Sequence, residues 1–172
     1  MQGYTEKYNY SHMWEFADLH GIKPTPALKS NTIYEYIRCS SDFSKFKKVV
    51  DNANMEGVLN DCEANFTLFL PKDSSLTHIP DEFFDTMDAG TAKQILKASL
   101  LDDKINKKIL VSSPVCYYAT LNPKMRMYCT NIGGYTRLNN CATVKEFDIN
   151  RKGGLIHIVD NILVPTEDHF MN

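Results

Sequence analysis

The stretch "GGLIHIVDNILVP", residues Gly153 to Pro165, decides the fold and also raises the question of function. Its apolar, β-branched composition is typical of a buried strand, yet it contains a histidine and an aspartate, His157 and Asp160. A histidine close to a carboxylate is a frequent arrangement in general acid–base catalysis. The stretch is therefore compatible with two hypotheses: an active site, or a core strand with two structural polar residues.

Strand periodicity favours the second hypothesis. Side chains alternate between the two faces of a strand, so His157 shares a face with Leu155 whereas Asp160 shares the opposite face with Ile158. A rise of about 3.3 Å per residue also separates His157 and Asp160 by about 10 Å along the strand, whereas a catalytic dyad needs atoms about 3 Å apart. We expect a buried, neutral His157 bonded to the backbone or to another polar group, and an Asp160 bonded to a nearby turn. A hydrolase that uses His157 and Asp160 is kept as a distant alternative.

The composition predicts one globular domain without a cofactor. The chain has 172 residues, is 43% hydrophobic and 23% charged, and has a net charge of -2, which provides no basic field for nucleic acid or anionic lipid. Its five cysteines have no framework or metal-binding spacing, so we expect reduced thiols and no metal site. Neither a glycine-rich phosphate loop nor a Gly-x-Ser-x-Gly elbow is present.

The targeting signals do not all agree. The N-terminal residues "MQGYTEKYNYSHMWEF" do not resemble a secretory signal, and no apolar run is long enough to span a membrane, so we expect synthesis in the cytoplasm. Asn9 in "NYS" and Asn65 in "NFT" match the glycosylation sequon, which would instead fit a protein at the cell surface.

Residues 1–30 have the composition of an N-terminal arm. A short helix with Trp14 and Phe16 is expected, followed by a linker with Pro24 and Pro26. The two aromatic side chains either pack on the domain itself or dock into a partner protein. Residues 166–172 are expected to form a C-terminal tail.

Residues 31–165 have helix patterns first and strand patterns later, which indicates an α+β domain with mostly antiparallel strands. Two helices are expected between residues 31 and 60, with Asn31 or Thr32 and then Asp42 as N-caps. A strand at "NFTLFLP" and two helices between residues 80 and 101 follow. The expected strands after Asp102 begin with "KINKKIL", residues 104–110, and end with the stretch quoted above.

Two of these segments resemble the signatures of a known family. "FTLFLPKDSSL", residues Phe66 to Leu76, resembles the first signature of the fasciclin-type adhesion domain, and "GGLIHIVDNILVP" resembles its second signature. The resemblance extends from Asn31 to about Pro165. The residues that carry it are Thr67, Phe69, Pro71, Asp73, Gly154, Ile156, His157, Asp160 and Pro165.

The resemblance implies a fasciclin-like β-sandwich or wedge of about seven mostly antiparallel strands, with helices packed along one edge. It also implies a non-enzymatic role in adhesion or matrix assembly through contacts with other proteins. Asp102 and Asp103 stand where the family commonly has Tyr-His, so integrin binding is not expected here. Asp148 and Ile149, in "EFDIN", resemble another integrin-associated segment; they are candidate partner-binding residues, although a structural role is favoured.

We therefore expect a structural or adhesive interaction module that is not an enzyme. Because the family occurs among large DNA viruses, a minor capsid or cement protein of a virion is the specific hypothesis, with the arm joined to neighbouring subunits. A cell-surface or matrix adhesion protein is the alternative.

Overall fold

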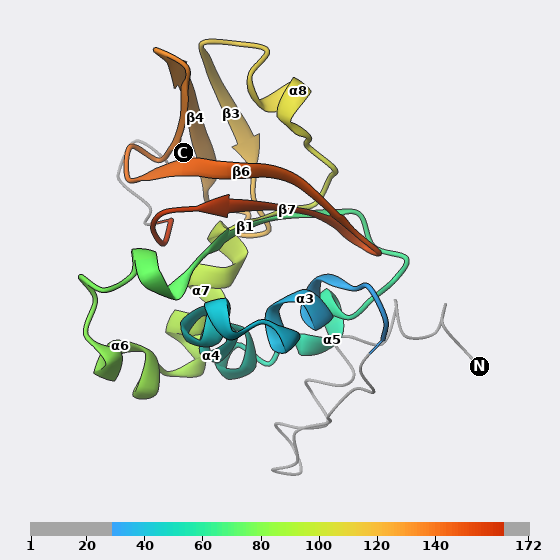
Figure 1. The fold of residues 1–172 in the computed structure, drawn as a ribbon, viewed down its shortest axis with the longest axis vertical. Coiled ribbons are helices and arrows are strands. Elements are labelled where there is room, and N and C mark those ends of the chain that lie inside the picture. Colours follow the sequence, from blue (N-terminus) through green and yellow to red (C-terminus); the bar gives the residue numbers. More distant parts are fainter. Residues whose placement is uncertain (1–28, 164–172) are drawn as a thin grey trace.

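The computed structural model describes residues 29–163, and every structural statement below concerns this part of the chain (Figure 1). Asn9, Trp14, Phe16 and Pro165 lie outside the described residues, so the expectations for the arm and the tail are not addressed by the structure. The helices are α3 (Ile33–Cys39), α4 (Ser44–Asn52), α5 (Glu56–Leu59), α6 (Asp81–Asp85), α7 (Ala89–Ala98) and α8 (Lys107–Leu110), with short 3-10 helices η1 (Ser41–Phe43) and η2 (Asp73–Ser75). The strands are β1 (Phe66–Pro71), β2 (Leu100–Leu101), β3 (Val115–Ala119), β4 (Arg126–Ile132), β5 (Tyr135–Leu138), β6 (Ala142–Arg151) and β7 (Gly154–Val159).

The seven strands form one sheet in the order β2-β1-β7-β6-β5-β4-β3. Every pairing is antiparallel except that of β1 with β7, which is parallel. These two neighbouring strands belong to the two signature segments, and their register runs from Phe66 opposite Gly154 to Pro71 opposite Val159. The α+β class with about seven mostly antiparallel strands, predicted from the sequence, is confirmed.

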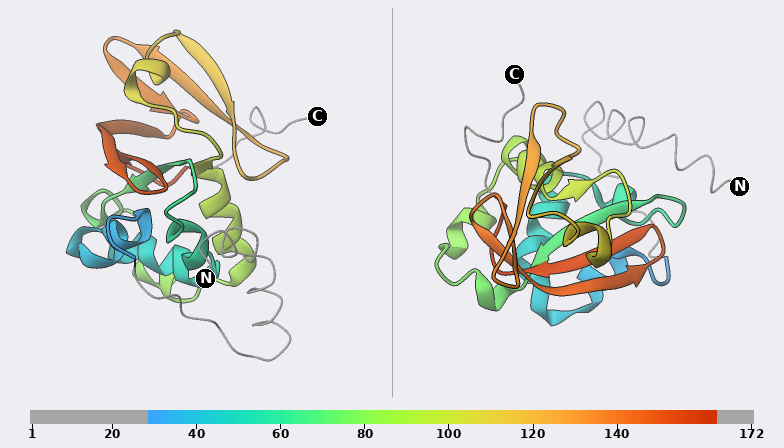
Figure 2. Two further views of the ribbon diagram at one scale, coloured as in Figure 1. Left: turned by 90° about the vertical axis from the view of Figure 1, so that its right-hand side faces the viewer. Right: turned by 90° about the horizontal axis from the view of Figure 1, so that it is seen from above.

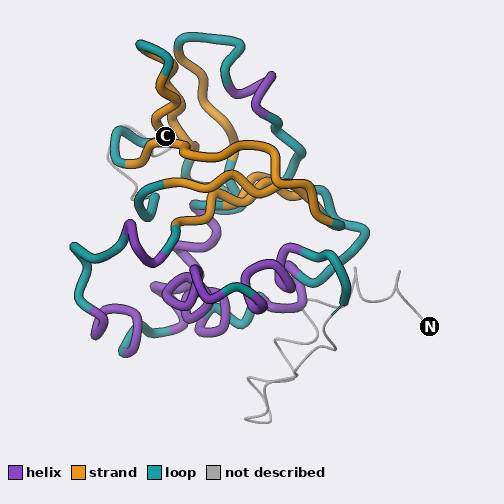
Figure 3. The backbone as a smooth tube through the Cα atoms, viewed as in Figure 1, coloured by secondary structure: helices purple, strands orange, loops and turns teal. Residues whose placement is uncertain are grey.

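The sheet separates two hydrophobic clusters. Helices α3 to α7 lie against one face of β1 and β7, as Figures 1 and 3 show, and Leu68, Leu70, Ile156 and Ile158 pack with them there. The opposite face, with Phe69 and Val159, packs against β4, β5 and α8. In Figure 2 the strands β3 to β5 extend away from β6 and β7 as a second lobe. Since side chains alternate along a strand, each signature strand contributes to both clusters.

The helix starts agree with the sequence at one position and differ at another. Thr32 caps α3, where its hydroxyl accepts a hydrogen bond from the backbone N–H of Glu35. The prediction that Asp42 caps the next helix is wrong, because Asp42 lies inside η1. The cap of α4 comes from the first signature instead: the Asp73 carboxylate accepts from Ser44 N at 3.0 Å and from Lys45 N at 2.9 Å.

The prediction of a strand at residues 104–110 is also wrong. The segment forms a loop and the four-residue helix α8, whose N-cap Asn106 accepts a hydrogen bond from the backbone N–H of Ile109 at 3.0 Å. Asparagine favours helix N-caps because its side chain satisfies an N–H that the helix leaves without a partner. Ile105 and Leu110 are buried, so these two apolar residues belong to the core although the segment is not a strand, whereas Ile109 is exposed.

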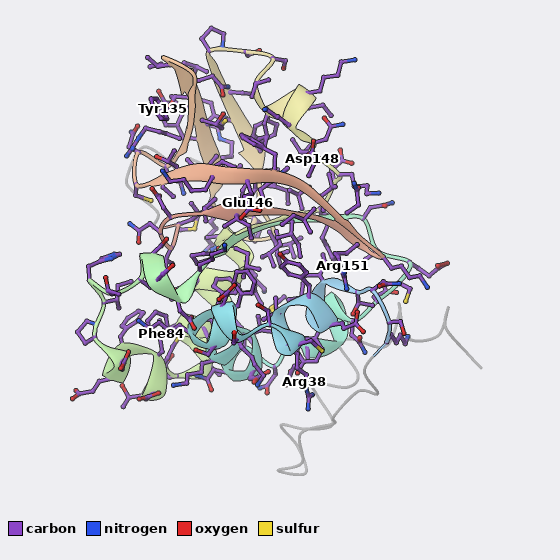
Figure 4. All side chains as sticks on the ribbon, viewed as in Figure 1. Arg38, Phe84, Tyr135, Glu146, Asp148 and Arg151 are labelled. Atoms are coloured by element: carbon purple, nitrogen blue, oxygen red, sulfur yellow. The ribbon has the colours of Figure 1, made fainter. Side chains whose placement is uncertain are left out.

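The turn between β6 and β7 requires two glycines. A Cβ atom on Gly153 would lie 2.2 Å from the backbone oxygen of Asp61, and one on Gly154 would lie 2.0 Å from that of Phe66. Phe66 N also donates to Gly153 O at 2.9 Å, which places the two signature strands in register. Arg151, labelled in Figure 4, joins the same turn to α3 through an ion pair with Glu35 at 2.7 Å.

Candidate functional site

His157 lies at the centre of the second signature and is fully buried. Its Nδ1 accepts a hydrogen bond from the backbone N–H of Asp148 at 3.1 Å, and its Nε2 lies 2.8 Å from the backbone oxygen of Ile105. Since Nδ1 is an acceptor, the neutral ring carries its proton on Nε2, which donates to Ile105. The ring lies between Phe69 and Phe147, at centroid distances of 5.4 and 5.6 Å.

The surroundings of His157 favour its neutral form. Burial lowers the pKa of His157 below its usual value, and the hydrogen bond to Ile105 and the charge of Asp148 oppose that shift only in part. Protonation of Nδ1 would also remove the acceptor for the Asp148 N–H. Both ring nitrogens are bonded to backbone atoms, so the ring has no nitrogen free to act as a general base.

Asp160 lies beyond the end of β7 and has a different set of partners. One carboxylate oxygen accepts from Thr143 N at 2.7 Å, and the other lies 3.9 Å from Lys145 Nζ. Asp160 N in turn donates to Thr143 O at 3.1 Å. Asp160 therefore joins the ends of β6 and β7, and the structure does not bring its carboxylate onto the ring nitrogens of His157.

The first-signature residues hold the loop that follows β2. Thr67 Oγ1 donates to the backbone oxygen of Asp103 at 2.6 Å and accepts from Ile105 N at 2.8 Å. Because Ile105 O is the acceptor for His157, the two signatures are connected through this loop. Pro71, the last residue of β1, pairs with Val159.

Asp148 and Ile149, the candidate partner-binding pair, lie on an irregular part of β6. The register of β6 with β7 shifts between Glu146 and Ile149, and Asp148 has a positive φ of 61° there. The Asp148 carboxylate is exposed and accepts from Lys107 N at 2.9 Å, next to α8 in Figure 4. Ile149 is partly buried against the helix-side cluster. Both residues thus have intramolecular contacts that account for their position.

Two cavities flank the Asp102–Asp103 turn. One cavity, of about 410 Å³, is lined by Asp61, Glu63, Ala64, Asn65, Phe66, Asp102 and Asp103. The other, of about 500 Å³, is lined by Leu101, Asp102, Asp103, Ile105, Tyr118, Ala119, Thr120, Leu121 and Pro123. We call the first the acidic cavity and the second the apolar cavity.

The sequence did not indicate Asp61 or Glu63 as site residues. Asp61 is only 4% exposed, and within residues 29–163 one of its carboxylate oxygens, Oδ2, has no hydrogen-bond partner. An unsatisfied buried acceptor costs about 1–3 kcal/mol. The only sequence signal for Asp61 is that it is an acidic residue close to the first signature strand. Its burial could not be predicted, because it depends on the distant Gly153, which packs against the Asp61 backbone.

A second exposed feature is the tip of the β4–β5 hairpin. Ile132 is 72% exposed and Tyr135 is 64% exposed, on either side of a two-glycine turn. Tyr135 is labelled on this lobe in Figure 4. Val115 and Tyr117 are exposed on the neighbouring β3, which is an edge strand of the sheet. Exposed aromatic and aliphatic side chains that lie close together are typical of protein contact surfaces.

Residues 29–163 provide neither a candidate metal site nor a helix that could span a membrane. These residues do not gather three histidine, cysteine, aspartate or glutamate side chains in positions that could hold a metal ion. None of the five cysteines, all of which lie within the described residues, forms a disulfide, and burial raises the pKa of the Cys129 thiol to about 11. None of the helices in this part of the chain combines the length and the apolarity that crossing a bilayer requires.

The fold and the two signature strands agree with a comparison of the sequence with protein families. The family model of the fasciclin domain matches residues 41–165. The chain belongs to the fasciclin domain family. The resemblance predicted from the two signatures is thereby confirmed.

A solved structure supports the same assignment at the level of the fold. It is the FAS1 domain pair from the insect cell adhesion molecule fasciclin I, which matches with a TM-score of 0.64 at 20% sequence identity. The match covers 81% of this chain and 53% of that chain, so this fasciclin domain spans about half of the domain pair. No curated protein sequence matches this chain.

Proposed function

We propose that this fasciclin domain is a non-enzymatic module for adhesion or protein interaction. The observation that carries the proposal is the environment of His157, the residue of the signatures best suited to catalysis. Both of its ring nitrogens are bonded to backbone atoms inside the core, at 3.1 Å from Asp148 N and 2.8 Å from Ile105 O. Its hydrogen bonds hold the β6 irregularity and the loop before α8 in place, which is a structural role.

The surface supports the same proposal. The exposed side chains of Ile132 and Tyr135 form an apolar hairpin tip, and Tyr117 on β3 adds a ring that stacks with the Arg126 guanidinium at 4.5 Å. A rigid sheet that carries exposed aromatic residues suits contact with another protein.

The test is a crosslinking pull-down from native material with the full chain as bait. The expected result is a reproducible protein partner whose yield falls several-fold for the exposed double variant Ile132→Ser/Tyr135→Ser or after deletion of residues 1–30. A matched control is Phe83→Ser, which replaces an exposed aromatic residue on α6, away from the hairpin, and should leave the yield unchanged. Capture of no partner, together with ester hydrolysis that is lost in His157→Gln, would contradict the proposal.

Two finer proposals differ in where the domain acts, in a virion or at a cell surface. For a minor capsid or cement protein, deletion of residues 1–30 should leave a folded domain that no longer enters the virion. For a cell-surface adhesion protein, native material should carry glycan mass at Asn65, which is exposed at the rim of the acidic cavity. The deletion variant entering virions unchanged would contradict the first setting, and an Asn65 without glycan would contradict the second.

A further inference from the structure

Two cysteines lie directly opposite each other on neighbouring strands of the second lobe. Cys116 is on β3 and Cys129 is on β4, and the antiparallel register of these strands pairs the two residues with each other. Side chains that are directly opposite in an antiparallel pair leave the sheet on the same face, so both Sγ atoms lie on one side of it. Within residues 29–163, no other two of the five cysteines are paired in this way.

The backbone spacing of this pair is within the range of a disulfide. Asn131 N donates to Pro114 O at 2.9 Å, and hydrogen-bonded pairs recur at every second residue of an antiparallel ladder. Cys116 and Cys129 lie two residues further along the ladder and therefore form such a pair, whose Cα atoms are about 5.5 Å apart. Disulfides join residues whose Cα atoms are about 4.4–6.8 Å apart. The bond can therefore form within the existing pairing of β3 with β4.

The two thiols differ in their surroundings. Cys129 is fully buried in the hydrophobic cluster on this side of the sheet, and its Sγ donates to Leu110 O at 3.8 Å. Burial raises the pKa of its thiol to about 11, and the nearby Cys116 is the second cause of that shift. Cys116 is partly exposed on the edge strand. Cys116 is therefore the thiol that a dissolved oxidant reaches first, and Cys129 is the thiol that completes the bond.

We propose that Cys116 and Cys129 form a reversible cross-strand disulfide when the domain meets an oxidising environment. The Cys116 thiolate attacks one sulfur of a small disulfide such as glutathione disulfide, which releases one glutathione thiolate and leaves a mixed disulfide on Cys116. The Cys129 thiolate then attacks Cys116 Sγ and releases the second glutathione thiolate. One S–S bond forms in the protein and one breaks in the oxidant. Two electrons pass from the cysteines to glutathione, and the two thiol protons go to the released thiolates.

The spacing of the pair also accounts for the reversibility of the bond. The Cβ atoms of directly opposite residues are about 4.5–5.5 Å apart, whereas a disulfide needs Cβ atoms about 3.5–4.5 Å apart. The two cysteines must therefore move closer by about 1 Å when the bond forms. A disulfide that stores such strain is reduced more easily than an unstrained one. The bond is thus suited to reversible oxidation.

The disulfide would hold an edge of the sheet that carries exposed aromatic residues. On the face opposite the cysteines, Tyr117 of β3 lies 5.0 Å from Tyr128 of β4, between ring centroids, and 4.5 Å from the Arg126 guanidinium. Tyr117 follows Cys116 and Tyr128 precedes Cys129, so the bond fixes the register of both rings. Oxidation should therefore stabilise the exposed surface of β3 and β4. The inference does not depend on the proposed function, because the bond forms whatever binds to that surface.

The test incubates the full chain with an excess of glutathione disulfide and maps the product by mass spectrometry without reduction. Trypsin cuts between the two cysteines, after Lys124 and Arg126, and so places them in separate peptides, residues 109–124 and 127–137. The expected product is a disulfide-linked pair of these two peptides, which dithiothreitol separates again. Absence of this linked pair, a link from either peptide to a different cysteine, or chains linked to one another would overturn the proposal.

Three variants test the order of the steps and the specificity of the pair. In Cys129→Ala, Cys116 should keep glutathione as a mixed disulfide, because the second thiol is missing, whereas in Cys116→Ser the buried Cys129 should stay unmodified. The matched control is Cys39→Ser, which removes an exposed cysteine at the end of α3 and should form the linked peptides as the wild-type chain does. An unmodified Cys116 in Cys129→Ala would overturn the proposal.

Amide hydrogen exchange measures what the bond does to the sheet edge. Oxidation should slow the exchange of residues 115–119 several-fold in the wild-type chain, because the crosslink opposes local opening of the edge strand. Treatment of Cys116→Ser with the same oxidant should leave this exchange unchanged. An oxidised wild-type chain that exchanges as fast as the reduced chain would overturn the proposal.

Discussion

Phe69 and His157 lie opposite each other on adjacent parallel strands, with their ring centroids 5.4 Å apart. Phe69 belongs to the first signature and His157 to the second, so this contact joins the two most characteristic segments of the chain. Both faces of β1 and β7 are covered, so successive residues of each signature strand pack alternately into one hydrophobic cluster and the other. His157 is therefore one of the residues that stabilise the packing of β1 against β7.

Replacement of His157 should destabilise the domain. In His157→Leu the Asp148 N–H and the Ile105 carbonyl each lose their partner in the core, so we expect a loss of about 2–4 kcal/mol in the free energy of unfolding. Denaturant unfolding followed by circular dichroism measures the loss. The matched control is His78→Gln: His78 is exposed and bonds Asn161 at 3.1 Å, and the change should cost less than about 0.5 kcal/mol. A change of similar size in both variants would contradict the structural role.

The stability of the domain should depend on pH through His157. Its pKa is lowered by burial in the folded state, so the unfolded chain, with a histidine pKa of about 6.5, binds a proton that the folded chain does not bind. Both states are neutral at this position above pH 7, and stability is lost as the pH falls below about 6.5. Between pH 7 and 5.5 we expect a loss of at most about 1 kcal/mol, which should be absent in His157→Gln. An equal slope in the variant would assign the effect to other groups.

Asp73 should contribute more than Asp42 to the stability of α4. Asp73 accepts from Ser44 N, Ser44 Oγ and Lys45 N at 3.0, 2.6 and 2.9 Å, so it caps a helix that lies about thirty residues earlier in the chain. We expect Asp73→Ala to cost about 1–2 kcal/mol. Asp42→Ala, at the position that the sequence favours as the cap, should change the free energy of unfolding by less than about 0.5 kcal/mol. The reverse order of the two values would show that the local cap is the effective one.

The glycine that opens β7 should not tolerate a side chain. In Gly154→Ala the new Cβ would lie 2.0 Å from the Phe66 carbonyl oxygen, so β1 and β7 would have to separate at that end. We expect a loss of more than about 3 kcal/mol in denaturant unfolding. Gly90→Ala is the control, because its Cβ would lie 3.5 Å from Asp88 Oδ1 in the first turn of α7, and alanine there should be neutral or stabilising by up to about 1 kcal/mol. Equal stability of the two variants would contradict the close approach of the signature strands.

The sequence predicted the fold well where a pattern is local. The apolar, β-branched runs in "GLIHIV" and "FTLFLP" identified β7 and β1. The orientation of His157 away from the face of Ile156 and Ile158 also follows from strand periodicity. These features depend on neighbouring residues, so one sequence is sufficient to read them.

Contacts between distant segments could not be predicted. The cap from Asp73 on α4 crosses from one signature to an earlier helix, and the local candidate Asp42 was preferred because capping rules consider only adjacent residues. The loop at residues 104–110 has apolar residues at both ends, which resembles a strand, but Asn106 starts a helix there. The acidic cavity combines residues 61–66 with 102–103, which are brought together by the pairing of β1 with β2 and by the hydrogen bonds of Thr67 to Asp103 and Ile105.

The protonation state of His157 tests the central claim most directly, namely that the histidine of the second signature is structural. Long-range ¹H–¹⁵N spectra of the imidazole, recorded on the full chain between pH 5.5 and 8, report which nitrogen carries the proton. The account predicts a neutral ring at pH 7 with its proton on Nε2, donated to Ile105 O, and an Nδ1 that becomes protonated only below the usual histidine pKa, because burial lowers the pKa of His157. A ring that titrates with a pKa at or above the usual value of about 6.5, or that carries its proton on Nδ1, would contradict it.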